Sequence, residues 1–91
     1  TARIENIDII EKSWVIRLRL LNKKLHNSLI EKASVSINGV SLTISKVYKN
    51  NFEINVIPHT LKLTNLKDLE RNDVVNVEID IFSKYIAKIK K

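Results

Sequence analysis

The chain lacks several residue types that would otherwise bring chemistry to it. Its 91 residues include no cysteine, which excludes disulfides, thiolate metal ligands and a thiol nucleophile. The two histidines, His26 and His59, are far apart in the sequence, so we expect no metal site. No apolar run approaches the roughly 20 residues that span a bilayer, and no signal-peptide pattern opens the chain. We therefore expect a cytoplasmic protein without a membrane partner.

Methionine is absent, and glycine and proline occur once each, as Gly39 and Pro58. Because no initiator methionine is present, we expect either that the initiator has been removed or, as the simplest account, that the chain is a piece of a longer protein. Glycine and proline interrupt regular structure, so these two positions are the strongest signals in the sequence for a turn or the end of a strand.

Aromatic residues are also few, with one Trp, two Tyr and two Phe. The formal net charge is +6, but the basic residues are spread along the whole chain, as on a solvated surface. A barrel that binds nucleic acid needs aromatic side chains on a basic groove. We therefore expect no nucleic acid partner.

Apolar and polar residues alternate over much of the chain, which predicts strands with one buried face. Asn38-Gly39 joins two such strands and predicts a type I′ hairpin turn. Six strands in so short a chain predict a mainly β fold, a closed six-stranded Greek-key barrel, with a two-layer sandwich as the alternative. We leave open whether the first strand is truncated. The expected strands cover residues 2–10, 14–20, 34–37, 40–47, 52–56 and 74–81.

Short helices are expected at three places. Leu25 and Leu29 are four residues apart, which predicts a helix over 23–30. Pro58 suits the first turn of a helix over 59–66. An apolar stripe opposite lysines predicts a helix that closes the chain at 82–91, so the barrel is assigned to residues 1–81.

Strand phase predicts an outward patch without charge. If the apolar residues of 40–47 point inward, Ser41 and Thr43 point outward. The same argument on the next strand leaves Ile57 outside, and Thr60 follows shortly after. Hydroxyls beside an apolar floor suit a neutral planar ligand better than a phosphate. The alternative is a solvated strand face that binds nothing.

Several spaced motifs resemble riboflavin synthase of the lumazine-binding family. They follow the family's order from about residue 13 to the end of the chain. The resemblance implies the second of the two tandem Greek-key barrels of such a protein. The motifs are I-N-G-V-S-L-T-I at 37–44, N-N-F-E-I-N-V-I-P-H-T-L at 50–61, L-T-N-L at 63–66, D-V-V-N-V-E-I-D at 73–80 and S-K-Y at 83–85.

The resemblance also implies a reaction. In riboflavin synthase, a transferase of riboflavin biosynthesis, one 6,7-dimethyl-8-ribityllumazine donates a four-carbon unit to another, giving riboflavin and a ribitylamino-pyrimidinedione without any cofactor. Each site lies between the first barrel of one subunit and the second barrel of a neighbour. A single barrel is then expected to supply half a site and to be inactive or weakly active alone. The resemblance further implies a homotrimer held partly by the C-terminal helix. The alternative is a non-catalytic lumazine- or flavin-binding module.

The family's ligand contacts carry over to this sequence position by position. The resemblance implies that Ser41 is the catalytic contact near the reacting carbons and that Lys32 lies at the mouth of the site. Two residues depart from the family pattern: Asn38 replaces an aspartate and cannot act as a base, and Ala33 replaces a glycine. The substrate-binding positions are Ser41, Thr43, Ile57, Pro58, His59, Thr60 and Lys32.

Overall fold

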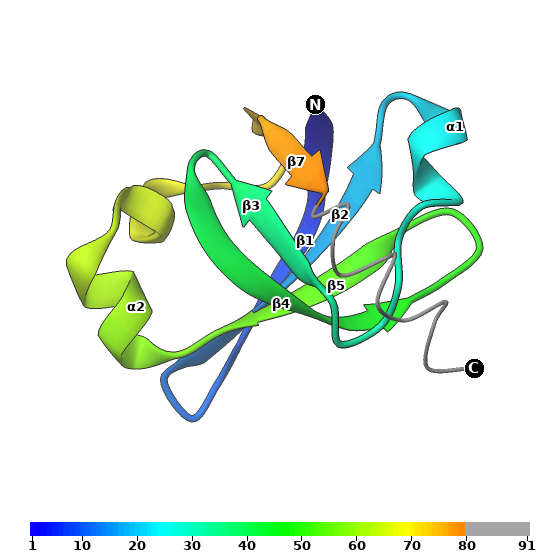
Figure 1. Ribbon diagram of the computed structural model, residues 1–91. Helices are drawn as coiled ribbons and strands as arrows, with labels where there is room; N and C mark the ends of the chain where they lie inside the picture. Colours follow the sequence, from blue (N-terminus) through cyan, green and yellow to red (C-terminus); the bar gives the residue numbers. More distant parts are fainter. Residues whose placement is uncertain (80–91) are drawn as a thin grey trace.

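The computed structural model describes residues 1–79, so the expected end of the last strand at 80–81 and the helix at 82–91 lie outside the described residues. Within that range the chain is mainly β (Figure 1). Its elements are β1 (Ala2–Ile10), β2 (Ser13–Leu20), α1 (Lys23–His26), β3 (Ser34–Ile37), β4 (Val40–Val47), β5 (Phe52–Val56), α2 (Pro58–Leu63), the 3₁₀ helix η1 (Asn65–Asp68), β6 (Val74–Val75) and β7 (Val77–Ile79).

The last strand segment closes the sheet on itself. The strand order is β6-β1-β2-β5-β4-β3-β7, and each neighbouring pair is antiparallel. Only Asn76 separates β6, which pairs with β1, from β7, which pairs with β3. One segment therefore bridges both edges, and the barrel is nearly closed. This confirms the mainly β Greek-key prediction; the seventh strand arises because the sixth breaks at Asn76.

The interior is filled by the apolar residues that the alternation predicted. Ile16, Ile54 and Ile44 lie opposite one another on β2, β5 and β4, and none is more than 1% exposed. Phe52, on β5, is also fully buried. Burying a side chain of this size stabilises a fold by about 1.5–3 kcal/mol, so this row is a main source of the barrel's stability.

A β-bulge changes which alternate residues of β1 face the barrel interior. Ile4 is paired with Leu18 and Asn6 with Arg17, which leaves Glu5 as the extra residue. Before the bulge Ala2 and Ile4 point inward, and after it the inward phase passes to Ile7 and Ile9. The two isoleucines share a face, as predicted, but Ile9 is 65% exposed because it lies at the far end of the hairpin.

The turn residues of the β3–β4 hairpin adopt the backbone conformation that the sequence predicts. Asn38 and Gly39 have φ of 48° and 85°, as a type I′ turn requires, and the prediction is confirmed. The hairpin between β1 and β2 uses Glu11 and Lys12, also at positive φ, although neither residue is a typical turn former.

Both helix predictions within the described residues need correction. The predicted helix over 23–30 is wrong beyond His26, because α1 ends there; Leu25 is exposed while Leu29 is buried. The predicted helix over 59–66 is interrupted at Thr64, whose backbone is extended and whose hydroxyl oxygen accepts from the Leu66 N–H at 3.3 Å. No helix within residues 1–79 is long and apolar enough to cross a membrane.

Candidate ligand-binding site

Four hydroxyl side chains form a continuous outward surface on β3 and β4. Ser36 lies opposite Ser41, and Ser34 lies opposite Thr43. The residues between them along each strand are buried, so all four side chains point away from the core. Directly opposed residues bring their Cβ atoms within about 5.5 Å. We call Ser34, Ser36, Ser41 and Thr43 the hydroxyl face.

An open hollow of about 240 Å³ lies along the edge of this face. Ser41 lines it together with Ser36 and with Glu78 of β7, which is the partner of Ser36 in the sheet. The expected patch carried no charge, so the carboxylate of Glu78 is a difference from the prediction. The lining residues are Ser34, Val35, Ser36, Ser41, Glu78 and Ile79.

The sequence reasoning missed Ser34, Ser36 and Glu78. Their signal was present, because each lies in the outward phase of its strand. The Asn38-Gly39 hairpin by itself places Ser34 and Ser36 beside β4. The position of Glu78 depends on the pairing of β3 with β7, which closes the barrel and which local alternation does not give.

Lys32 is held next to the Thr43 end of the hydroxyl face. Its N–H donates to the Ile44 carbonyl oxygen at 2.7 Å, and the Ile44 N–H donates to the Ala33 carbonyl oxygen at 2.9 Å. Its backbone is in the left-handed region, with φ of 69°, and its side chain is exposed. The positive φ therefore falls on the lysine itself and not on Ala33, the position for which the resemblance implies a glycine.

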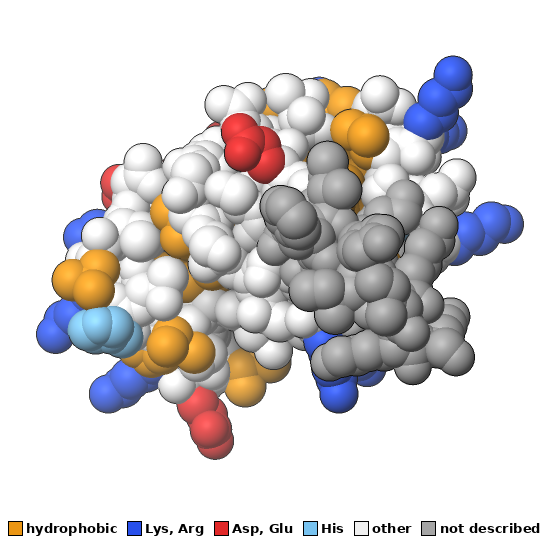
Figure 2. All heavy atoms as spheres, viewed as in Figure 1, with side chains coloured by type: hydrophobic (Ala, Val, Ile, Leu, Met, Phe, Trp, Pro, Cys, Tyr) orange, Lys and Arg blue, Asp and Glu red, His pale blue; other side chains and the backbone are white. Residues whose placement is uncertain are grey.

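The remaining predicted residues form a corner where β5 meets α2, at 57–60. Ile57 is 57% exposed, and its carbonyl oxygen accepts from the Leu61 N–H at 3.1 Å, which begins the helix. Pro58 and His59 are exposed, and Thr60 is half-buried. Figure 2 shows hydrophobic side chains around a histidine over α2. The corner is thus a partly apolar surface with one titratable ring.

The structure brings the predicted residues together in two groups. Ser41 and Thr43 are joined to β3, and the recorded pairing of β4 with β5 begins only at Ile44, opposite Ile54. The corner continues β5, the sheet neighbour of β4 on its other side. Both groups are accessible and lie on adjacent strands, but no backbone pairing links Ser41 to Ile57.

A cluster of charged contacts lies towards the other end of β4 and β5. The Tyr48 hydroxyl donates to Glu53 Oε1 at 2.8 Å, and Arg17 Nη2 lies 3.3 Å from Glu53 Oε2. The hydrogen bond to Glu53, reinforced by partial desolvation and the carboxylate charge, raises the pKa of Tyr48. These charges are paired with one another, away from the hydroxyl face.

The chemistry available at the hydroxyl face is hydrogen bonding and orientation. Serine and threonine hydroxyls both donate and accept, so they can follow a ligand that offers carbonyls, ring nitrogens and alcohols. Within residues 1–79, no group of three or more histidine or acidic side chains is placed to hold a metal ion.

An antiparallel barrel whose wall carries a hollow lined by serine hydroxyls and one carboxylate defines a small-molecule-binding β-barrel. Residues 1–80 match the family model described as the lumazine binding domain. The chain belongs to the lumazine-binding domain family, which confirms the resemblance found in its motifs.

Relatives of known name are riboflavin synthases. The chain is 38% identical over 88 residues to that of Actinobacillus pleuropneumoniae, covering 97% of the chain and 40% of the relative. It is 46% identical over 68 residues to that of Photobacterium leiognathi, covering 75% and 31%. It is 30% identical over 91 residues to that of Buchnera aphidicola subsp. Schizaphis graminum, covering 100% and 44%. The chain thus spans less than half the length of these curated relatives.

A solved structure shares the fold. The crystal structure of LumP complexed with flavin mononucleotide has a TM-score of 0.80 and is 29% identical in sequence, covering 87% of this chain and 44% of that chain.

Proposed function

We propose that the chain is a barrel domain of a riboflavin synthase and that it binds 6,7-dimethyl-8-ribityllumazine at the hydroxyl face and the corner. The observation that carries the proposal is the outward row of Ser36 and Ser41 beside an open hollow, on a barrel of the lumazine-binding family. The matches to riboflavin synthases support the transferase activity of the whole protein.

The hydroxyl face would hold the reacting side of the substrate. Ser41 hydrogen-bonds near the reacting ring carbons, and Thr43, one outward position further along β4, supplies a second hydroxyl. Lys32, fixed beside the Thr43 end, reaches the ribityl chain. Glu78 adds an acceptor at the rim of the hollow for a ribityl hydroxyl.

The corner would hold the rest of the ring. The exposed Ile57 side chain packs on the ring face, while Thr60 and the backbone around Ile57 bond the pyrimidine edge. Pro58 fixes the direction of the chain at this point, and His59 is a peripheral contact. Such a site contributes mainly by positioning two lumazines relative to each other, with modest acid–base assistance.

The second lumazine needs a second barrel. We infer that the family's first barrel supplies the opposing half of the site, and that trimerisation through residues 82–91 brings the halves together. A lone barrel then binds substrate and turns it over weakly or not at all.

The test is to mix the chain with 6,7-dimethyl-8-ribityllumazine and to follow its fluorescence and the appearance of riboflavin. We expect saturable binding without appreciable riboflavin, and turnover when a separately expressed first barrel from a relative is added. Thr43→Val should weaken binding several-fold, because a hydrogen bond contributes about 1 kcal/mol. Thr1→Val, the same change at an exposed residue outside both groups, should leave binding unchanged. Absence of any saturable response would reject the proposal.

A second candidate function is a non-catalytic flavin-binding module. The observation that favours it is the likeness to LumP, whose structure holds flavin mononucleotide. This candidate predicts that riboflavin or flavin mononucleotide binds at least as tightly as the lumazine, and that adding the partner barrel produces no riboflavin.

A further inference from the structure

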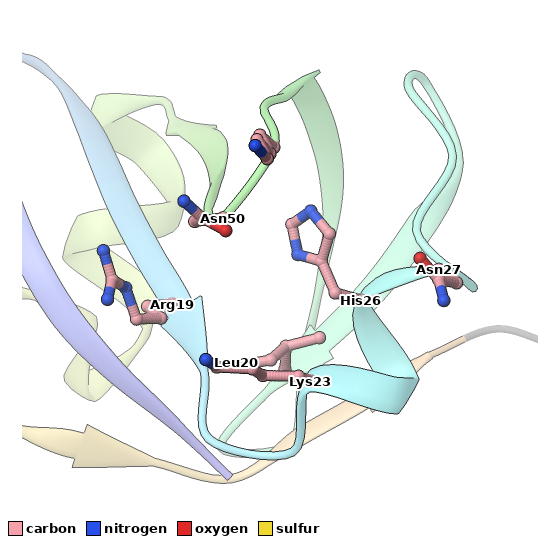
Figure 3. A pocket seen from close by; sticks show the side chains of 7 residues that line it. Arg19, Leu20, Lys23, His26, Asn27 and Asn50 are labelled. Carbon is pink, nitrogen blue, oxygen red and sulfur yellow. The ribbon is translucent and has the colours of Figure 1, made fainter.

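A second hollow lies at the opposite end of β4 from Ser41. It has a volume of about 190 Å³ and is formed where three segments meet: the end of β2, the α1 region and the turn between β4 and β5 (Figure 3). Among the described residues that line it, none is acidic and three are formally cationic. We call it the basic hollow; its residues are Arg19, Leu20, Lys23, His26, Asn27, Lys49 and Asn50.

Hydrogen bonds fix two of its walls. His26 Nε2 lies 2.6 Å from the Tyr48 carbonyl oxygen, and because a carbonyl only accepts, this nitrogen carries the proton. The bond ties α1 to the β4–β5 turn. The Tyr48 N–H donates to the Asn51 carbonyl oxygen at 2.8 Å and closes the turn that carries Lys49. Figure 3 shows the imidazole reaching from α1 toward Asn50.

The third wall is ordered by an acidic side chain that does not line the hollow. Glu5 Oε2 lies 3.0 Å from Arg19 Nε, while Glu5 Oε1 accepts from Asn51 Nδ2 at 3.0 Å. Since Glu5 engages Nε, the two terminal nitrogens of the guanidinium are left to meet a ligand. Arg19 is therefore both oriented and available.

Two of the three cations have no counter-charge. Glu5 balances Arg19, but among the described residues no carboxylate is within ion-pair distance of Lys23 or Lys49. A concave surface with uncompensated charge of one sign concentrates counter-ions. The residual charge of two matches a dianion, and Leu20 is the only apolar residue in the lining.

We propose that the basic hollow binds a phosphate dianion, either free or as the terminal group of a phosphomonoester. Two lysine ammonium groups supply charge, the arginine fork suits phosphate oxygens, and the amides of Asn27 and Asn50 supply further donors. The proposal is independent of lumazine binding, because that substrate has no phosphate and the hydroxyl face lies at the other end of β4.

The experiment titrates the chain with sodium phosphate and follows amide chemical shifts by NMR, with sodium chloride keeping the ionic strength constant. The expected result is saturable shifts at Lys23, Asn27 and Asn50. Removing both free charges in K23Q/K49Q should weaken binding about tenfold, since partly screened charges contribute of the order of 1 kcal/mol each. The control K62Q/K67Q removes the same charge on α2 and η1 and should change the affinity less than about twofold.

A second titration uses ribose 5-phosphate. Equal affinity would identify the free dianion as the recognised species, and tighter binding would identify the phosphate group of a larger molecule. Shifts equal to those caused by chloride alone, or an equal loss in both double variants, would overturn the proposal. All four lysines are exposed, and matching thermal unfolding curves would establish that both double variants fold.

Discussion

Asn38 and Asn76 form two reciprocal hydrogen bonds, here called the clasp, across the edge at which the barrel closes. The Asn38 N–H donates to the Asn76 carbonyl oxygen at 2.9 Å, and the Asn76 N–H donates to Asn38 Oδ1 at 2.8 Å. The turn between β3 and β4 is thereby tied to the break between β6 and β7. The Asn38 side chain thus serves as a hydrogen-bond acceptor, which an aspartate at this position would also be.

Asn38→Ala should destabilise the fold by about 2 kcal/mol. It removes one hydrogen bond, worth about 1 kcal/mol, and places alanine at a positive φ, which costs about 1 kcal/mol or more. Asn38→Asp keeps the acceptor and the conformational tolerance, so it should stay within about 0.5 kcal/mol of the parent. Urea unfolding of the two variants measures this, and equal losses in both would contradict the clasp.

Gly39→Ala should cost about 1–2 kcal/mol through backbone conformation alone. Gly39 has φ of 85°, and a Cβ added there would meet nothing within 4 Å, so strain at positive φ is the only penalty. Gly39→Asn should cost less, because asparagine tolerates this region. The measurement is again urea unfolding, and a loss with asparagine as large as with alanine would point to a steric cause instead.

The sequence predicted the parts of the fold that depend on local pattern. The alternation in β4 and β5 correctly gave the buried and outward residues, and Asn38-Gly39 gave the hairpin. The turn between the expected strands at 2–10 and 14–20 is also confirmed at Glu11 and Lys12. The sequence did not reveal its positive φ, because the strand pairing on either side imposes that conformation on residues that do not favour it.

Long-range pairing also explains part of what the sequence analysis missed at the site. Outward phase was readable for Ser36 and Glu78. The hairpin register sets Ser36 opposite Ser41, but the position of Glu78 beside them depends on β7 closing the barrel against β3. The bulge at Glu5 is a second long-range effect, since its side chain is held by residues on β2 and on the β4–β5 turn.

The Tyr48 hydroxyl should titrate above the usual tyrosine pKa of about 10. The folded pKa is raised mainly because the phenol donates to Glu53. The associated stabilisation is therefore complete below pH of about 10 and is lost as the pH rises through the folded pKa. In a Tyr85→Phe background, tyrosinate absorbance reports Tyr48 alone. Glu53→Gln should lower its midpoint, and an unchanged midpoint would show that Glu53 is not the cause.

Ile54→Val should cost about 1 kcal/mol, and Ile54→Ala about 2–5 kcal/mol. Ile54 is fully buried between Ile16 and Ile44, so each removed methyl leaves a cavity in the central row. Ile9→Ala is the matched control, because Ile9 is 65% exposed and should lose less than about 1 kcal/mol. Thermal or urea unfolding measures both, and similar losses at the two positions would contradict the assigned core.

Ile57→Ala tests whether the corner belongs to the lumazine site. If the Ile57 side chain packs on the ligand ring, the ring can cover only the 57% of it that is exposed. At about 0.8 kcal/mol for each fully buried methylene, removing its three carbons should then cost about 1.4 kcal/mol, or about tenfold in lumazine affinity. Stability should change little, because the residue is 57% exposed without ligand. Leu63→Ala is the matched control, since Leu63 is 72% exposed at the end of α2, the helix that follows Ile57, and has no assigned ligand contact. Fluorescence titration of both variants decides the point: equal affinity for both would confine the site to the hydroxyl face, because an isoleucine that contacts the ring cannot be truncated without loss.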